Sequence, residues 1–336
     1  MRVLRAFGLL LLVAAFAAAA WVWLDYQRFV DAPLNVGTSS KILEVERGDS
    51  FTRVVSKLSS SGMTNADPLY WRALGWRSGM AKRLQVGEYD IAPGTSPLAL
   101  LRQLHDGRVR QYRFTIVEGW NIRELRAALA RRTDLAQTLS GLDDATLMER
   151  LERPGVHPEG RFLPETYAFV RGERDVDLLR RAADAMDRAL ASAWSHRAAD
   201  LPLDSPDQAL TLASVIEKET GVSGERRRIA GVFVRRLKLG MLLQTDPTVI
   251  YGIGDAYAGN ITRAHLTTDT PYNSYTRAGL PPTPIAMPGV AAIAAAVDPA
   301  PGDELYFVAR GDGSHEFSAS LEQHNAAVAR FQLGRR

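Results

Sequence analysis

The chain has 336 residues, of which 46% are hydrophobic and 24% charged, and its formal net charge is +3. These values exclude a disordered, collagen-like or coiled-coil protein, and so small a positive charge does not indicate a nucleic-acid partner. There is no cysteine, and no two histidines lie three or four residues apart. The sequence therefore excludes thiol nucleophiles, disulfides, cysteine-based metal sites and a helical His-x-x-x-His metal site.

The N-terminal segment predicts a transmembrane helix. Residues 6–24 contain no charged or strongly polar side chain, and as a helix they would be about 28 Å long, close to the thickness of a bilayer core. Arg2 and Arg5 precede this segment, so the positive-inside rule makes residues 1–5 a cytoplasmic tail and puts the remaining chain outside. The alternative is a cleaved signal peptide, with the alanines at 17–20 as its cleavage site. The length of the apolar run favours a retained anchor.

Residues 25–40 are interpreted as a polar linker, followed by a mixed α+β fold. A strand-like stretch, a glycine turn and a helix N-cap occur three times in succession, which is also what ordinary strand-to-helix turns look like. The turn glycines are Gly48, Gly94 and Gly119. The first two copies, at residues 45–50 and 91–96, resemble the first half of a LysM module, a small glycan-binding fold.

Two domains are expected after the linker, a LysM-like α+β subdomain over residues 41–107 and a larger α+β domain over residues 108–336. Capping residues and apolar periodicity predict several elements in the larger domain. These are helices over 207–221, 223–238, 289–297 and 321–330, a hairpin over 305–318, and a long ordered loop over 266–289.

The helix expected over 207–221 carries the sharpest chemical anomaly. Projected at about 100° per residue, Glu217 falls inside the apolar arc, Lys218 on the solvent side and Glu219 on the other margin of the arc. Apolar surroundings disfavour the charged form of a carboxyl, and a protonated carboxyl is what a general acid for glycoside cleavage requires. From geometry alone, the simpler interpretation is that both glutamates are surface carboxylates.

Polar and aromatic side chains follow this helix in loop-like sequence. They combine stacking rings with amide and hydroxyl groups, which is the mix that binds sugars. Together with Glu219, the candidate substrate-binding residues are Gln244, Asp246, Tyr272, Asn273, Tyr275 and Thr276.

These stretches resemble the YceG/MltG endolytic murein transglycosylases. The matching segments are Ala-Ser-Val-Ile-Glu-Lys-Glu-Thr at 213–220, residues 243–252, Thr-Pro-Tyr-Asn-Ser-Tyr-Thr at 270–276, and residues 279–285, with further matches at 162–167 and 306–325. The resemblance covers most of residues 41–330. It implies an inner-membrane anchor, a LysM-like subdomain and a periplasmic catalytic domain that faces the cell wall. Its catalytic glutamate, the first of Glu-Lys-Glu-Thr, is Glu217 here.

The reaction that the resemblance implies needs one acid and no metal or cofactor. The protonated carboxyl donates to the oxygen between N-acetylmuramic acid (MurNAc) and N-acetylglucosamine (GlcNAc). The resulting carboxylate removes the proton of the muramyl C6 hydroxyl, which attacks C1 and leaves a 1,6-anhydro end. The partners implied are peptidoglycan glycan strands, the inner membrane and peptidoglycan synthases.

Two alternative functions remain open. A muramidase would cut the same bond with water and would need a second carboxylate as base or nucleophile. A non-catalytic, membrane-anchored scaffold would only bind the wall, although the unbroken motif around Glu217 argues against it.

Overall fold

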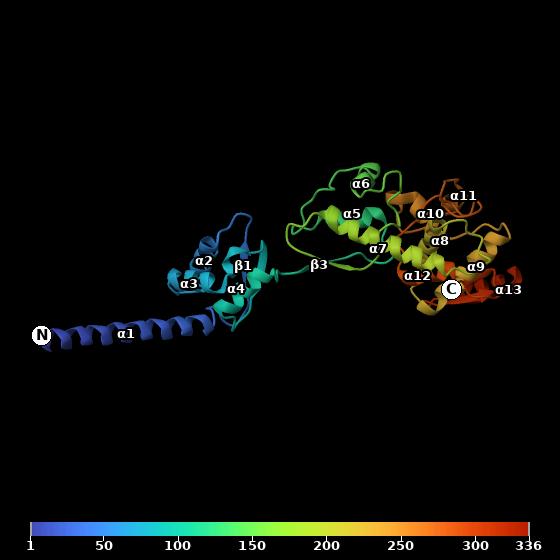
Figure 1. Cartoon of the computed structure of the whole chain (residues 1–336). Coiled ribbons are helices and arrows are strands. Elements are labelled where there is room, and N and C mark those ends of the chain that lie inside the picture. The colour runs from blue at the N-terminus through green and yellow to red at the C-terminus, as the bar shows by residue number, and fades with distance from the viewer. Residues whose placement is uncertain (1, 335–336) are drawn as a thin grey trace. The chain divides into compact units, whose positions relative to one another are not determined.

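The computed structural model describes residues 2–334, with side chains from residue 5 onward. The chain divides into two compact units, with the boundary between Tyr112 and Arg113. Unit 1 contains α1 (Arg2–Asp31), β1 (Lys41–Val45), α2 (Phe51–Ser60), α3 (Pro68–Ser78), the short helix η1 (Met80–Lys82), β2 (Gly87–Ile91) and α4 (Pro97–Asp106) (Figure 1). β3 (Tyr112–Thr115) begins at the boundary.

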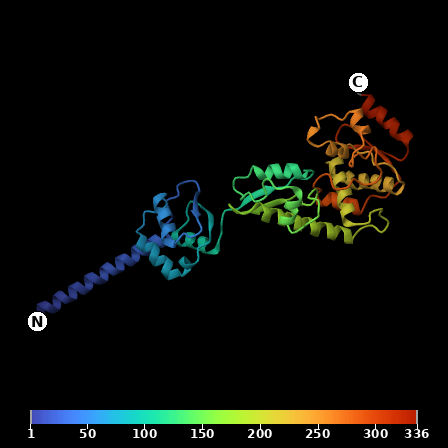
Figure 2. The same cartoon turned by 90° about the horizontal axis from the view of Figure 1, so that it is seen from above.

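Unit 2 is mainly helical, and its elements can be followed from green to red in Figures 1 and 2. Its first half contains α5 (Ile122–Ala130), α6 (Asp144–Arg150), β4 (Thr166–Phe169), α7 (Asp175–Ser195) and α8 (Pro206–Glu219). Its second half contains η2 (Ser223–Glu225), α9 (Arg226–Lys238), α10 (Asp246–Ile253), η3 (Gly254–Ala256), α11 (Arg263–Thr267), α12 (Val290–Val297), β5 (Tyr306–Ala309), β6 (His315–Ser318), α13 (Leu321–Val328) and η4 (Ala329–Leu333). Mixed helices and small sheets confirm the α+β class.

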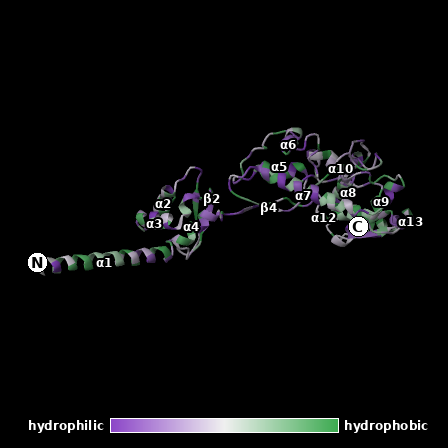
Figure 3. Ribbon diagram, in the orientation of Figure 1, coloured by the Kyte–Doolittle hydropathy of each residue, from purple (hydrophilic) through white to green (hydrophobic). Residues whose placement is uncertain are grey.

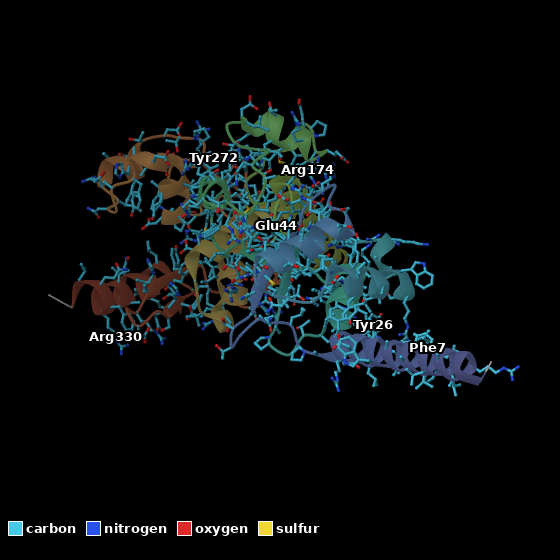
Figure 4. All side chains as sticks on the ribbon, turned by 90° about the vertical axis from the view of Figure 1, so that its left-hand side faces the viewer. Phe7, Tyr26, Glu44, Arg174, Tyr272 and Arg330 are labelled. Carbon is cyan, nitrogen blue, oxygen red and sulfur yellow. The ribbon has the colours of Figure 1, made fainter. Side chains whose placement is uncertain are left out.

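The first helix has the length and composition of a membrane span. Residues 5–31 of α1 form the one helix in the described part of the chain that is long and apolar enough to cross a bilayer. Figure 3 shows the hydrophobic run along α1, and Figure 4 shows Phe7 on its exposed part and Tyr26 nearer its end. A helix that keeps large apolar side chains such as Phe7 exposed suits lipid better than water.

The segment expected as a linker, residues 25–40, is partly helical and partly packed on unit 1. The helix continues to Asp31, and four apolar side chains between residues 26 and 36 are buried in the core of unit 1. They are Tyr26, Val30, Leu34 and Val36. The Tyr70 hydroxyl of α3 also donates to Asp25 Oδ2 at 2.7 Å. Tyr26 and Val30 lie four positions apart on α1 and therefore share one face of the helix, while Leu34 and Val36 follow in the irregular segment after it.

All three strand–glycine–helix repeats are present. The hydroxyls of Ser50 and Ser96 and the amide of Asn121 accept from backbone N–H groups at the starts of α2, α4 and α5. Each preceding turn glycine has a φ between 77° and 92°, a conformation that side chains with a Cβ rarely adopt. β1 and β2 pair with each other, antiparallel, with Lys41 opposite Ile91. The first two copies therefore belong to one β-α-α-β arrangement and are not separate modules.

The core of unit 2 forms around α8. All eight residues from Ala209 to Ile216 are buried, and α8 packs against α7, α9, α10 and α12. The helix starts as predicted, with Ser205 as N-cap and Pro206 in its first turn. It ends at Glu219 instead of residue 221, because Thr220 takes an extended conformation. The predicted hairpin is also present, as the antiparallel pair β5–β6.

Candidate functional site

A pocket of about 540 Å³ lies in unit 2 at the end of α8. That volume is in the range of small-molecule and sugar sites. Four of the predicted site residues line it, namely Glu219, Gln244, Asp246 and Tyr275. The opposite wall comes from the C-terminal hairpin and α13, through Tyr306, Phe307, His315, His324 and Asn325. Segments about 100 residues apart in the sequence thus meet at one carboxyl-lined cavity.

Glu219 is the last residue of α8 and is only partly exposed. Burial, with a smaller contribution from the negative charge of Asp246, raises the pKa of its carboxyl to about 7. The Thr245 hydroxyl, which donates to Glu219 Oε1, and the positive charge of His315 act in the opposite direction. A large fraction of the Glu219 carboxyl is therefore protonated at neutral pH, which is the state that a general acid needs.

The segment before α10 is held against this carboxyl in a strained conformation. Gln244 has a φ of 50°, unusual for a residue with a side chain. Its N–H donates to Ser274 O at 3.1 Å, and the next N–H, of Thr245, donates to Ser274 Oγ at 3.0 Å. The buried Arg236 guanidinium donates to the carbonyl oxygens of residues 242 and 243. Strain of this kind persists where surrounding contacts fix it, and it commonly marks functional sites.

Asp246 and Tyr275 form a second polar feature of the pocket. The Tyr275 hydroxyl donates to Asp246 Oδ1 at 2.6 Å. Burial and the nearby carboxylate of Asp246 raise the pKa of Tyr275, so its hydroxyl stays protonated. The pair offers a sugar an aromatic ring and a carboxylate side by side.

Glu217, the predicted acid, has other contacts. Its side chain is 6% exposed, its Oε2 accepts from the Gly289 N–H at 3.0 Å, and its Oε1 lies 3.5 Å from Arg226 Nη2. Gly289 is the N-cap of α12, and Arg226 begins α9. The carboxyl thus joins α8 to the starts of two neighbouring helices, where a negative charge stabilises the α12 dipole. It is not among the residues that line the 540 Å³ pocket, and its assignment as the acid stays a prediction.

Three other predicted substrate contacts, Tyr272, Asn273 and Thr276, are not among the residues that line this pocket. The Tyr272 hydroxyl is hydrogen-bonded to the Thr283 hydroxyl at 2.8 Å, and its ring packs edge-on against Tyr251. The Thr276 hydroxyl donates to Asp269 Oδ1 at 2.9 Å. Both side chains support the loop that the sequence predicted as ordered.

The prediction that Asn273 contacts sugar does not fit its surroundings. Asn273 is 1% exposed, and its Nδ2 donates to the carbonyl oxygens of residues 265, 266 and 268. Its Oδ1 accepts from the Tyr275 N–H at 2.9 Å. Every polar atom of the amide is thus used within the loop, as is common for Asn in turns.

Replacing Asn273 by alanine is expected to destabilise unit 2 by about 1–3 kcal/mol, because it removes the hydrogen bonds of a buried amide that hold the loop together. Thermal unfolding should shift to lower temperature, while the rate of glycan cleavage measured well below that transition stays close to wild type. Normal melting combined with poor cleavage would instead restore the substrate-contact role.

Several lining residues received no role from the sequence. Arg236, Tyr306, His315, His324 and Asn325 complete the pocket. The last four lie within the stretch 306–325 that carries part of the resemblance, which was the signal available for them. Among the described residues, no group of His, Asp or Glu side chains has the arrangement of a metal site.

The chain is similar to known proteins over most of its length. The YceG-like family matches residues 43–330. An endolytic murein transglycosylase of Bacillus subtilis (strain 168) is 29% identical over 306 residues, covering 86% of this chain and 84% of the relative. Another, from Streptococcus pneumoniae (D39), is 25% identical and covers 97% of this chain, which spans 65% of that relative.

A solved structure of a YceG-like protein from Listeria monocytogenes has 25% identity and a TM-score of 0.55. The match covers 86% of this chain and 98% of that one. Since the family match spans the β-α-α-β part of unit 1 and the pocket of unit 2, this chain belongs to the YceG-like family.

Proposed function

We propose that this protein is an endolytic lytic transglycosylase that cleaves the MurNAc–GlcNAc β-1,4 bond of peptidoglycan strands. The observation that carries the proposal is the Glu219 carboxyl, with a pKa raised to about 7, in a polar and aromatic pocket. Support comes from relatives that are endolytic murein transglycosylases. Cleavage by such an enzyme terminates or trims nascent strands.

Glu219 suits the general acid better than Glu217 does. Both carboxylate oxygens of Glu217 contact neighbouring helices, through Arg226 and the Gly289 N–H, and Glu217 does not line the 540 Å³ pocket. Glu219 accepts one side-chain hydrogen bond and faces the negative charge of Asp246. In our proposal the Glu219 proton goes to the glycosidic oxygen, and the muramyl C6 hydroxyl closes the 1,6-anhydro ring.

Digestion of purified peptidoglycan by the full chain in detergent tests the function. Mass analysis should show internal cuts whose new muramyl ends are lighter by one water than reducing ends. Reducing ends would indicate a muramidase, for which Asp246 is the available second carboxylate in the pocket. No cleavage by folded protein that still binds strands would indicate the scaffold.

We further propose that α1 anchors the protein in the inner membrane, with its N-terminus cytoplasmic and unit 2 periplasmic. The support is the apolar span and the arginines that precede it. Such an anchor would hold the enzyme near peptidoglycan synthases.

Protease added to spheroplasts is expected to degrade unit 2, while the membrane fraction retains a short N-terminal fragment that contains α1. Complete protection would reverse the orientation. A mature protein that begins near residue 20 would mean that the segment is a cleaved signal peptide.

The LysM-like assignment of residues 41–107 is also a proposal. It is supported by the β1-α2-α3-β2 order with an antiparallel strand pair. Co-sedimentation with insoluble peptidoglycan tests this proposal, using the full chain with Glu219 replaced so that the strands stay uncut. If the subdomain binds glycan, substitutions on its surface should lower the fraction of protein that sediments.

A further inference from the structure

A histidine in the pocket wall is held by a largely buried carboxylate. His315 begins β6, and its Nδ1 lies 2.7 Å from Glu225 Oε2. Its backbone N–H donates to the other oxygen of the same carboxylate, Glu225 Oε1, at 2.9 Å. The His315 and Glu225 side chains are only 11% and 13% exposed. One carboxylate thus fixes both the strand end and the ring.

The contacts of Glu225 determine which nitrogen of His315 is free. A carboxylate accepts hydrogen bonds, so Nδ1 carries the hydrogen and, in the neutral ring, Nε2 presents a lone pair. Among the described residues Nε2 has no hydrogen-bond partner, and it is not a buried atom left unsatisfied. The ring lines the pocket, and Phe307 packs perpendicular to it at 5.4 Å. Nε2 is therefore available to a molecule in the pocket.

His324, in the same wall, is not held in this way. It stacks on Tyr306 at 5.1 Å, its Nδ1 is buried without a partner, and burial lowers its pKa. It has a ring contact, but no carboxylate among the described residues is hydrogen-bonded to it to select its tautomer. The carboxylate-held ring is thus a particular property of His315 within this pocket.

We propose that His315 is the proton acceptor for the muramyl C6 hydroxyl and that Glu225 is its positioning residue. The inference rests on the proposed transglycosylase function and divides the acid and base roles between two side chains on one pocket. His315 and Glu219 line the same pocket, so both can reach one bound strand. A carboxylate that orients a basic imidazole is a recurrent catalytic arrangement.

The step balances without water, metal or redox change. The C1–O4 bond breaks as Glu219 gives its proton to O4 of the departing GlcNAc. The C6 oxygen forms a bond to C1, and its proton moves to His315 Nε2. The imidazolium then returns a proton to the Glu219 carboxylate through the solvent of the emptied pocket, which restores both groups.

The test is rescue by a free base. In the full chain in detergent, acting on purified glycan strands, His315→Ala should lower the rate of anhydro-end formation by about 10²-fold or more. Added imidazole should restore part of this loss, while it leaves the wild type and Glu219→Gln unchanged. His196→Ala, at the exposed end of α7, is the matched control and should keep the wild-type rate with no response to imidazole.

Glu225→Gln tests the positioning role. An amide cannot accept from both Nδ1 and the backbone N–H, since one of its two positions is a donor. The maximal rate should fall with little change in KM, and the same substitution added to His315→Ala should cause little further loss. Additive losses would remove Glu225 from the positioning role.

The outcomes separate the two proposals. A His315→Ala rate within about threefold of wild type, or a loss that imidazole does not restore, would overturn the base assignment. If His315→Ala unfolds at too low a temperature to be assayed, His315→Gln replaces it and is measured in the cold. Its rate of anhydro-end formation should be as low as that expected for His315→Ala, and the rescue by imidazole is not required of it. Failure of the proposed function has a different signature, because the wild type itself would then form no anhydro ends.

Discussion

Glu219→Gln is expected to lower the rate of glycan cleavage by about 10²–10⁴-fold, the usual contribution of a general acid. Glutamine keeps the size of the side chain and can still accept the hydrogen bond from the Thr245 hydroxyl, but it has no proton to transfer. The fold should therefore remain, and the far-ultraviolet circular dichroism should match that of the wild type. Initial rates of anhydro-end formation on purified strands provide the measurement.

Glu217→Gln is the matched comparison, one helical half-turn away on α8. It removes the charge that faces Arg226 and the α12 N-terminus, so we expect a loss of stability, on the order of 1–3 kcal/mol, with cleavage largely kept in the cold. The reverse pattern, in which Glu217→Gln is folded but inactive and Glu219→Gln is active, would return the acid role to Glu217.

The same Glu219→Gln variant is expected to become more stable relative to the wild type as pH rises from 5 to 8. Folding raises the Glu219 pKa from 4.5 to about 7 because the carboxyl is buried. Between these values the folded state binds more protons than the unfolded state, so the stability of the wild type falls as pH rises. Glutamine does not titrate. The pH-dependent change in unfolding free energy of the variant relative to the wild type should therefore approach roughly 3 kcal/mol at pH 8.

Urea unfolding of both full chains in detergent, followed by tryptophan fluorescence at several pH values, measures this difference. The buried Glu159, whose pKa is also raised to about 7 by burial, is present in both proteins, so its effect cancels. A stability difference that stays constant across this pH range would mean that Glu219 is not held in an environment that disfavours its charge.

Local sequence was sufficient for several elements of this protein. The apolar run predicted α1, and the N-caps Ser50, Ser96 and Asn121 predicted the starts of three helices. Each of these signals acts within one or two turns of the residue that carries it, which is why it can be read without the fold. The burial of four side chains between residues 26 and 36 was missed, because composition alone does not show which polar-looking segment has a partner surface.

The placement of the two carboxyls was decided by tertiary structure. Glu217 and Glu219 are two residues apart on one helix, with Glu217 inside the apolar arc and Glu219 on its margin. Their surroundings come from distant parts of the chain. Gly289 contacts Glu217, whereas Thr245 and the C-terminal hairpin surround Glu219. Helical periodicity determines the direction in which a side chain leaves its helix, so the sequence by itself identified the helix and its pair of acids. Which acid faces a pocket and which joins two helices depends on the packing of segments up to about 100 residues away, and only the folded chain brings those segments together.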